Sequence, residues 1–289
     1  MDNTNDLQLA AIEKFRALHE SGCFVLPNPW DVGTSVYLKH LGFEALATTS
    51  AGFAFSRGLP DTADAIERFD MIGHVRDIVR ATPLPVNADF QNGFADEPQG
   101  VADNVALCIA TGVAGLSIED SSPASGGLYE FPLAVERIQA ARAAIDASGV
   151  PVILTARCEG WLVGVTDPLQ VALDRLVAFA EAGADCLYAP GVSDPDQIAA
   201  IVKAVSPKPV NLLVSRPNPA LTVSRLTDLG VRRISVGSAL SLVAWGSFMR
   251  AAQMIQETGS FDGFSGAATY KEVNDLFSEV KSDRKKSEK

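Results

Sequence analysis

Hydrophobic and polar residues follow one repeated pattern along this chain. A stretch with helical periodicity leads to a glycine or a proline, and a short apolar run then ends in polar residues. Glycine after a helix and proline just before a strand are common stop signals. Seven copies are recognisable, at residues 37–50, 81–90, 107–120, 148–157, 179–190, 206–215 and 226–238. With the apolar run at 22–28, they predict eight strands.

Helical patterns separate these strands and are predicted at residues 31–41, 63–81, 99–112, 133–147, 167–182, 194–205, 218–229 and 239–257. Strands that are apolar throughout indicate a parallel sheet, either covered by helices on both faces or closed into a barrel. An open doubly wound sheet usually carries a glycine-rich phosphate loop after its first strand, and residues 24–33 contain none. The sequence therefore favours an α/β fold, a (β/α)8 TIM-type barrel with an additional N-terminal helix and an additional C-terminal helix.

The length of 289 residues suits one barrel domain, because barrels of this kind often need about 250 residues. We predict a single domain over 1–289. Residues 1–20 form the N-terminal helix, 21–257 the barrel core, and 258–289 a C-terminal helix with a charged tail.

Composition and charge narrow the choice of partners. With 47% hydrophobic and 20% charged residues, the chain has the composition of a soluble globular protein. A net charge of −11 argues against nucleic acid and against an anionic membrane as partners. No targeting segment or long apolar run is visible, and the four cysteines form no CxxC pair. We expect a cytoplasmic protein with reduced thiols.

Polar side chains end three of the predicted strands. Asn87 and Asp89 lie in PVNADFQNGF, Glu119 in LSIEDSSP, and Arg157 closes PVILTAR. The active site of a (β/α)8 barrel lies where its strands end, so we expect these residues to converge. The three histidines fall in predicted helices and no lysine lies at a strand end, which disfavours a histidine base and a Schiff base.

The remaining groups suit a hard cation such as Mg²⁺, with Mn²⁺ as an alternative. Asp89, Glu119 and the loop residue Asp61 could surround it, directly or through water. Arg157 would grip a substrate carboxylate in a fork. The alternative for Arg157 is an ion pair with Glu119 or Glu159 that only holds the barrel mouth.

In combination, several motifs carry a resemblance that covers nearly the whole chain. They are the two acidic strand ends, PNPWDVGTS at 27–35, ATTSAGFAFSRGLPD at 47–61, TARCEGWLVG at 155–164, GADCLYAPGVSD at 183–194 and GVRRISVGSAL at 230–240. The chain resembles the isocitrate lyase/phosphoenolpyruvate mutase superfamily, a set of Mg²⁺-dependent barrels that act on 2-oxo acids and related carboxylates.

The resemblance implies roles for particular residues. Asp61, Asp89 and Glu119 would hold the metal and its waters. The substrate would be bound by Ser50, by the backbone around Ala51 and Gly52, and by Arg157 at the same end. Asn211 is a further candidate for substrate binding because of its position at a later strand end, not because of the resemblance.

Three departures limit this transfer. The Asp-x-Asp motif of the family reads Asn87-Ala88-Asp89 here, so Asn87 would be a metal ligand without charge. The loop 121–131 lacks the cysteine of the isocitrate and methylisocitrate lyases. The phosphonate enzymes of the family carry a lysine in this loop and a histidine after the sixth strand. This chain has neither, and the residues after its sixth strand read YAP at 188–190.

In that loop, the plausible proton carriers are Tyr129 and Ser121 or Ser122. Tyr129 could protonate an enolate when the loop closes, or it could simply pack beside Phe131. Cys158 is expected to be a small core residue and not a nucleophile.

The predicted function is that of a Mg²⁺-dependent lyase for C–C bonds of 2-oxo or 2-hydroxy carboxylic acids. The reaction would be a decarboxylation or a retro-aldol cleavage through an enolate of pyruvate or glyoxylate, with Arg157, Tyr129 and Glu119 as catalytic residues. Two alternatives stay open. One is a P–C bond mutase or hydrolase acting on a phosphonate such as phosphonopyruvate, and the other is a barrel that binds a carboxylate without turning it over.

The expected partners are a small carboxylic acid and further copies of the chain. Residues 239–256 are apolar nearly all round, more than one barrel face can cover. Members of the family pair through this helix, so the resemblance implies a dimer or homotetramer. The alternative is that the last helices fold back over their own barrel. Phe53, Phe55, Phe90 and Trp161 are expected to give the pocket an apolar wall.

Overall fold

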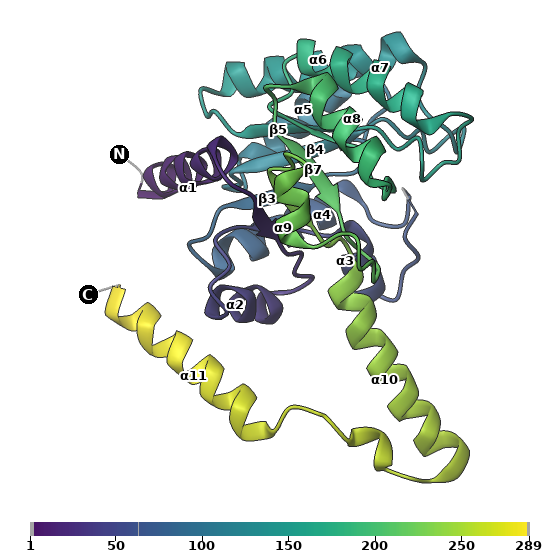
Figure 1. Cartoon of the computed structure of the whole chain (residues 1–289). Helices are drawn as coiled ribbons and strands as arrows, with labels where there is room; N and C mark the ends of the chain where they lie inside the picture. The colour runs from purple at the N-terminus through teal and green to yellow at the C-terminus, as the bar shows by residue number, and fades with distance from the viewer. Residues whose placement is uncertain (1–2, 63, 288–289) are drawn as a thin grey trace.

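Eight parallel strands form a nearly closed barrel in the computed structural model, which describes residues 3–62 and 64–287, with side chains over 5–62 and 64–280 (Figure 1). Each strand pairs in parallel with its neighbour in the order β1-β8-β7-β6-β5-β4-β3-β2. The strands are β1 (Phe24–Leu26), β2 (Leu46–Ala47), β3 (Val86–Asp89), β4 (Gly115–Glu119), β5 (Ile153–Arg157), β6 (Cys186–Tyr188), β7 (Val210–Leu213) and β8 (Arg233–Ser235). All eight predicted strands and the TIM-type barrel are confirmed.

The seam between β1 and β2 is closed by few bonds. Ala47 N donates to Pro27 O at 3.0 Å. The buried side-chain amide of Asn28 supplies three further bonds across the seam. Its Nδ2 donates to Thr48 O at 2.8 Å, and its Oδ1 accepts from Val236 N and Gly237 N at 3.0 and 2.9 Å. One side chain thus ties the ends of β1, β2 and β8 together.

Helices cover the outside of the barrel and extend from both of its ends (Figure 1). They are α1 (Asn3–Glu20), α2 (Val32–His40), α3 (Ser50–Ser56), α4 (Arg68–Ala81), α5 (Pro98–Ile109), α6 (Phe131–Ser148), α7 (Pro168–Glu181), α8 (Pro195–Val205), α9 (Val223–Asp228), α10 (Ala239–Thr258) and α11 (Tyr270–Ser287), with the 3₁₀ turn η1 (Asp262–Phe264). The helical spacing of apolar residues explains the layer, since Val101, Val105 and Cys108 on α5 are fully buried in the core.

Helix boundaries differ from the prediction in three places. No helix was predicted at residues 50–56, but they form α3, whose N-cap Thr49 accepts a bond from Gly52 N. The helix predicted over 218–229 begins only at Val223, after Pro217 and Pro219 and behind the N-cap Thr222. The helix predicted over 63–81 begins at Arg68. Its expected first residue, 63, lies outside the described residues, and so do residues 1–2 and 288–289 of the predicted terminal segments.

Phe15 of α1 closes the amino end of the barrel. Its side chain is fully buried and meets the rings of His19 and Phe24 edge-on. Only glycine fits above it, because a Cβ on Gly115 would lie 2.9 Å from Phe15 Cε1 and 2.9 Å from Asn87 Oδ1. The opposite, carboxyl end is therefore the open one.

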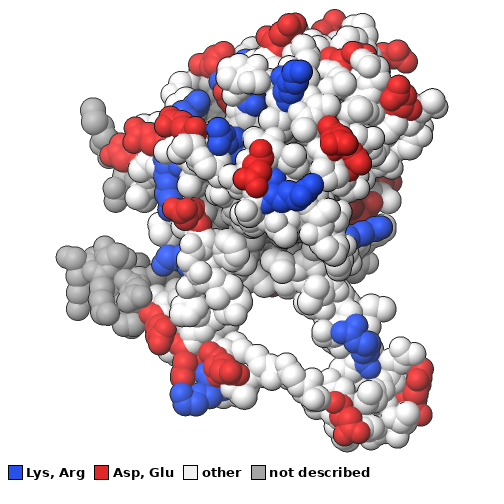
Figure 2. Space-filling model, in the orientation of Figure 1, with Lys and Arg blue, Asp and Glu red and all other residues white. Residues whose placement is uncertain are grey.

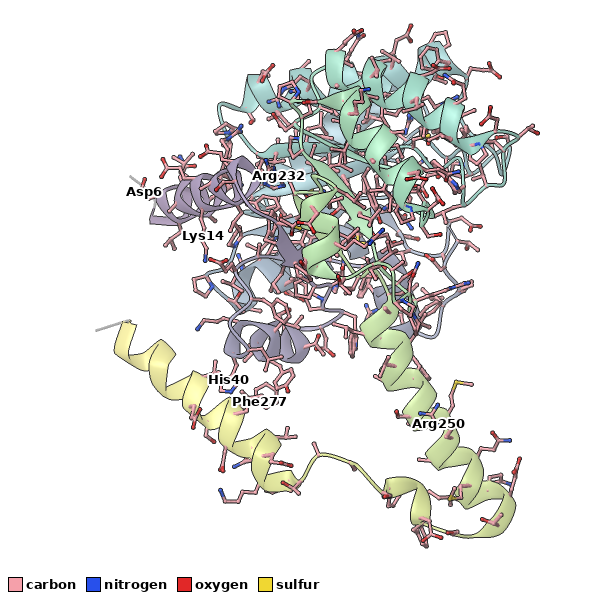
Figure 3. The ribbon with its side chains drawn as sticks, in the orientation of Figure 1. Asp6, Lys14, His40, Arg232, Arg250 and Phe277 are labelled. Carbon is pink, nitrogen blue, oxygen red and sulfur yellow. The ribbon has the colours of Figure 1, made fainter. Side chains whose placement is uncertain are left out.

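The chain after β8 forms an arm that leads away from the barrel. Helix α10 projects outward, and α11 returns beside α2, where Phe277 points toward the region of His40 (Figures 1 and 3). Helix α10 carries few charged residues in Figure 2, and its Val243, Phe248 and Met249 are each at least 60% exposed. Within a single chain α10 does not fold back over its own barrel, and the oligomeric state stays a prediction. No helix in the described ranges is both long and apolar enough to cross a membrane.

Candidate active site

A cavity of about 200 Å³ opens at the carboxyl ends of the strands. It is lined by side chains that the sequence predicted for the site, namely Ser50, Ala51, Asp61, Asn87, Asp89, Arg157 and Asn211. Glu119 lines an adjoining cavity under the loop 121–131, together with Ser50, Asp61 and Arg157. The parallel strands have brought these residues together from distant parts of the chain.

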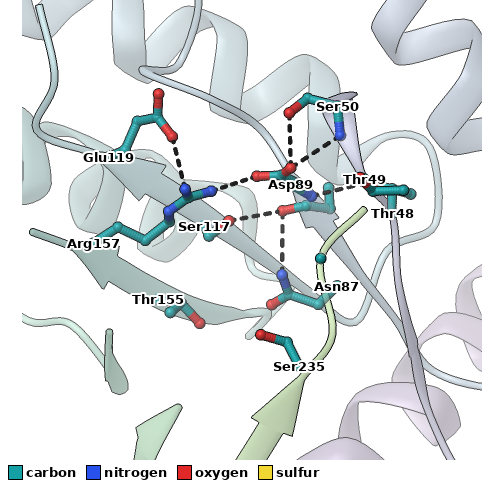
Figure 4. A network of polar contacts seen from close by, with 12 residues as sticks. Thr48, Thr49, Ser50, Asn87, Asp89, Ser117, Glu119, Thr155, Arg157 and Ser235 are labelled. Atoms are coloured by element: carbon teal, nitrogen blue, oxygen red, sulfur yellow. Dashed lines mark hydrogen bonds and ion pairs between the residues drawn. The ribbon is translucent and has the colours of Figure 1, made fainter. Parts of the chain in front are cut away.

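Asp89 is held between the end of β2 and the end of β5. Its Oδ2 accepts bonds from Ser50 N at 3.0 Å and from Ser50 Oγ at 2.9 Å, and its Oδ1 lies 2.6 Å from Arg157 Nη1 (Figure 4). The backbone N of Asp89 donates to Thr48 Oγ1 at 2.8 Å. The first turn of α3 and the end of β3 therefore form one unit.

Arg157 sits at the centre of three carboxylates. Besides Asp89, its Nη2 lies 3.2 Å from Glu119 Oε2 and its Nε lies 2.9 Å from Glu159 Oε1. The guanidinium also lies over the ring of Tyr188, 5.1 Å from its centre. Burial alone would lower the pKa of Arg157, but Glu159, Glu119 and Asp89 outweigh it and raise that pKa well above its usual value. Both ion pairs that formed the alternative role for Arg157 are present.

Negative charge is crowded in this cluster. Burial raises the pKa of Glu159 to about 8, although Arg157 opposes the shift. Burial, with help from Asp89, also raises the pKa of Glu119 and of Asp61, while Arg157 again acts in the other direction. Several carboxyl groups that resist ionisation around one arginine mark a place where a further cation would be stabilised.

The donor set fits a hard cation chemically. Asp61, Asp89 and Glu119 offer carboxylate oxygens, and Asn87 Oδ1 is a buried oxygen without a hydrogen-bond partner in the described structure. Arg157 now lies between Asp89 and Glu119, and among the described residues no three His, Cys, Asp or Glu side chains are close enough to enclose an ion as they stand. To hold a cation together, Asp89 and Glu119 would have to release their ion pairs with Arg157.

The predicted substrate-binding residues divide into two groups. Ser50 and Ala51 line the cavity, whereas Gly52 lies behind them, where a Cβ would come within 2.6 Å of Thr49 Cγ2. Asn211 lies deeper, with Nδ2 donating to Ser235 Oγ at 3.0 Å and Oδ1 accepting from Arg233 Nε at 2.8 Å.

Tyr129 is placed away from the cavity. Its hydroxyl donates to Asp96 Oδ1 and accepts from Asn92 Nδ2, and its ring packs under the guanidinium of Arg137. Burial, followed by Asp96, raises its pKa to about 12. From the same loop, Ser121 does reach the site and donates to Glu119 Oε1 at 2.9 Å.

The apolar wall expected from Phe53, Phe55, Phe90 and Trp161 is wrong in its residues, because none of these four described side chains lines the cavity. Phe53 and Phe90 are buried in the core, and the apolar lining of the cavity comes from Leu26, Leu162 and Leu213. Phe90 directly follows β3. Because side chains alternate along the strand direction, Phe90 points outward when Asp89 faces the cavity. Cys158, one position after Arg157, is likewise buried in the core, as expected.

Tyr188 and Arg233 are two of the residues of the site that were missed. Tyr188 and Arg233 both line the cavity, and each is the cross-strand partner of a predicted residue, Arg157 and Asn211 respectively. For Arg233 the available signal was its place as a basic residue inside an apolar strand, in GVRRISVG. The pattern does not show which residues of other strands lie beside it, so its position in the cavity could not be predicted.

Comparisons with known proteins place the chain in a family and agree with the barrel fold. The phosphoenolpyruvate phosphomutase family matches residues 15–256. A 2-methylisocitrate lyase of Halalkalibacterium halodurans is 26% identical over 92% of this chain and 89% of its own length. An oxaloacetate decarboxylase of Pseudomonas savastanoi is 30% identical over 80% and 79%.

Two solved structures are similar throughout. A candidate lyase/mutase from Burkholderia cenocepacia superposes with a TM-score of 0.89 and 47% identity, covering 94% of this chain and 97% of the other. An oxaloacetate acetylhydrolase in complex with the product oxalate superposes with a TM-score of 0.84 and 25% identity, covering 96% and 99%.

Proposed function

Because this chain belongs to the phosphoenolpyruvate mutase/isocitrate lyase superfamily of lyases and mutases, we propose that it is a Mg²⁺-dependent lyase that breaks a C–C bond of a small 2-oxo or 2-hydroxy carboxylic acid. The observation that carries the proposal is the cluster of Asp89, Glu119 and Glu159 around Arg157 at the carboxyl ends of the strands. An oxaloacetate decarboxylase and an oxaloacetate acetylhydrolase among the similar proteins support a small oxo acid as the substrate.

Asp61, Asp89, Glu119 and Asn87 would hold Mg²⁺ or Mn²⁺, directly or through water. A bound divalent cation supplies positive charge that stabilises an enolate oxygen as it develops. With Asp89 and Glu119 engaged in holding the cation, Arg157 would have its guanidinium fork free to bind the substrate carboxylate beside Ser50 and Ala51.

Decarboxylation needs less from the protein than retro-aldol cleavage does. A retro-aldol step needs a base for the substrate hydroxyl and an acid for the product, and Tyr129 is turned toward Asp96 and away from the cavity. Loss of CO₂ from an oxaloacetate-like acid needs only orientation of the acid by Arg157 and Ser50 and stabilisation of the enolate. We therefore place decarboxylation first, with Tyr129 as a proton donor only if the loop 121–131 rearranges.

A proton NMR time course with Mg²⁺ tests the proposal on oxaloacetate, 2-methylisocitrate, 2,3-dimethylmalate and phosphonopyruvate. Rates are taken relative to protein-free samples, because oxaloacetate loses CO₂ slowly by itself. Asp89→Ala serves as the test variant, and Asp103→Ala on the exposed face of α5 as its control.

The outcomes separate the alternatives. Pyruvate or glyoxylate released from a carbon acid, lost in Asp89→Ala and kept in Asp103→Ala, supports the lyase. Turnover of phosphonopyruvate alone would replace it by P–C bond chemistry. No turnover of any acid, with no effect of Mg²⁺, would leave a barrel that only binds carboxylates.

A further inference from the structure

Arg233 is a buried guanidinium that has no acidic partner among the residues whose side chains are described. Only 2% of the residue is exposed, and no carboxylate in the described structure forms an ion pair with it. Its neighbours are neutral: Nε donates to Asn211 Oδ1 at 2.8 Å, Nη2 donates to Thr155 Oγ1 at 2.9 Å, and Nη1 lies 3.4 Å from His19 Nε2. Burial and then Arg233 lower the pKa of His19 to about 3, so this histidine is neutral as well. A buried charge without a counter-charge is costly and calls for an explanation.

The contrast with Arg157 sharpens the point. Arg157 is paired with Asp89, Glu119 and Glu159, so every side of its guanidinium group in the upper part of the cavity already has a carboxyl partner. Arg233 lines the same cavity, and no carboxylate of the described side chains forms an ion pair with it. The positive charge that the protein offers to an anion in this cavity is therefore concentrated at the lower end.

The strand register explains how Arg233 reaches the cavity. Glu119, Arg157, Tyr188, Asn211 and Arg233 are successive cross-strand partners on β4, β5, β6, β7 and β8. Residues in one such row face the same side of the sheet, here the inside of the barrel. Arg233 is the first residue of β8, so the row runs from the open mouth to the floor next to Phe15.

We propose that Arg233 and Asn211 form an anion subsite on the cavity floor that binds a second carboxylate of the substrate. The inference rests on the proposed function, which places the first carboxylate at Ser50 and Arg157. A guanidinium carries five N–H donors, and three protein acceptors leave donors of Arg233 for a ligand. Asn211 is held in one orientation by Arg233 and Ser235.

The size of the cavity fits this assignment. Its volume of about 200 Å³ is below the roughly 300–1,000 Å³ of pockets for drug-sized ligands. A short dicarboxylic acid fits, with one end at the mouth and the other at the floor. The subsite would make the enzyme selective for acids with two negative groups over monocarboxylates of the same length.

Isothermal titration calorimetry with Mg²⁺-loaded protein tests the subsite. Malate and 2-hydroxybutyrate share the 2-hydroxy acid end and differ in whether the far end is a carboxylate or a methyl group. Wild-type protein should bind malate about ten- to a hundredfold more tightly, the effect expected for hydrogen bonds from a charged donor. Arg233→Met should weaken malate binding to the level of 2-hydroxybutyrate and leave 2-hydroxybutyrate unchanged, and Arg233→Lys should lie between. Arg142→Met, on α6, is the control.

Equal binding of the two acids by wild-type protein refutes the subsite without any variant, and so does a preference that survives in folded Arg233→Met. Oxalate, which lacks the far end, reports on the mouth alone. Oxalate binding without a malate preference overturns the floor subsite and leaves the proposed function standing. A malate preference that depends on Arg233, without oxalate binding, supports the subsite and contradicts the cation site. Binding of none of the three acids overturns both.

Discussion

Asn28 is expected to be the most sensitive single position for closure of the barrel. Asn28→Ala removes three hydrogen bonds at once, one to Thr48 O and two from Val236 N and Gly237 N. Each bond contributes about 1 kcal/mol net, so the loss in the free energy of unfolding should be about 3 kcal/mol. Water from the adjacent cavity, which Asn28 lines, can satisfy part of the exposed backbone and keeps the loss from being larger.

Urea unfolding followed by tryptophan fluorescence and far-UV circular dichroism measures this loss. Asn218→Ala is the matched control, since its amide oxygen accepts one bond, from Ala220 N, in an exposed loop. A loss in Asn28→Ala no larger than in this control would refute the assignment of Asn28 as the closure of the seam.

Three further predictions concern the site and the arm. Mg²⁺ at a hundred times its dissociation constant should stabilise the fold by about 2.7 kcal/mol in thermal unfolding, and the gain should vanish in Asp89→Asn while the matched Asp103→Asn keeps it. The folded-state pKa of Glu159 is raised from 4.5 to about 8, so protonation of this residue favours folding below pH 4.5 and ceases to do so as the pH rises through 8. Wild-type protein should therefore lose up to about 1.4 kcal/mol per pH unit more than Glu159→Gln over this range, and equal pH profiles in urea unfolding would contradict the shift. Val243→Glu with Phe248→Glu should lower the mass in light scattering while Leu7→Glu on α1 does not, and an unchanged mass would argue against assembly through α10.

The sequence predicted the fold and most of the cavity because both follow from short-range patterns. Apolar runs bounded by glycine and proline located the strands, and the parallel arrangement brought Asp89 and Arg157 together. The pattern did not show where the loop 121–131 turns its side chains, so Tyr129 was expected nearer the site than it lies. It also could not show that Arg233 continues the row of Arg157, because cross-strand register depends on closure of the whole barrel. Helix α3 was missed since its seven residues are fewer than a periodic pattern needs.

The polar side chains inside the barrel have a consequence for protein engineering. In many barrels of this type the inside is filled by branched apolar residues, and larger ones there can add stability. Here Asn87, Ser117, Thr155 and Asn211 occupy that place, and each faces or holds a cavity-lining group. Apolar substitutions at these positions would remove binding groups and leave Arg233 with fewer acceptors. Thermostable variants should therefore be sought in the layer between strands and helices, where side chains such as Val105 and Leu176 pack in the core and do not line the cavity.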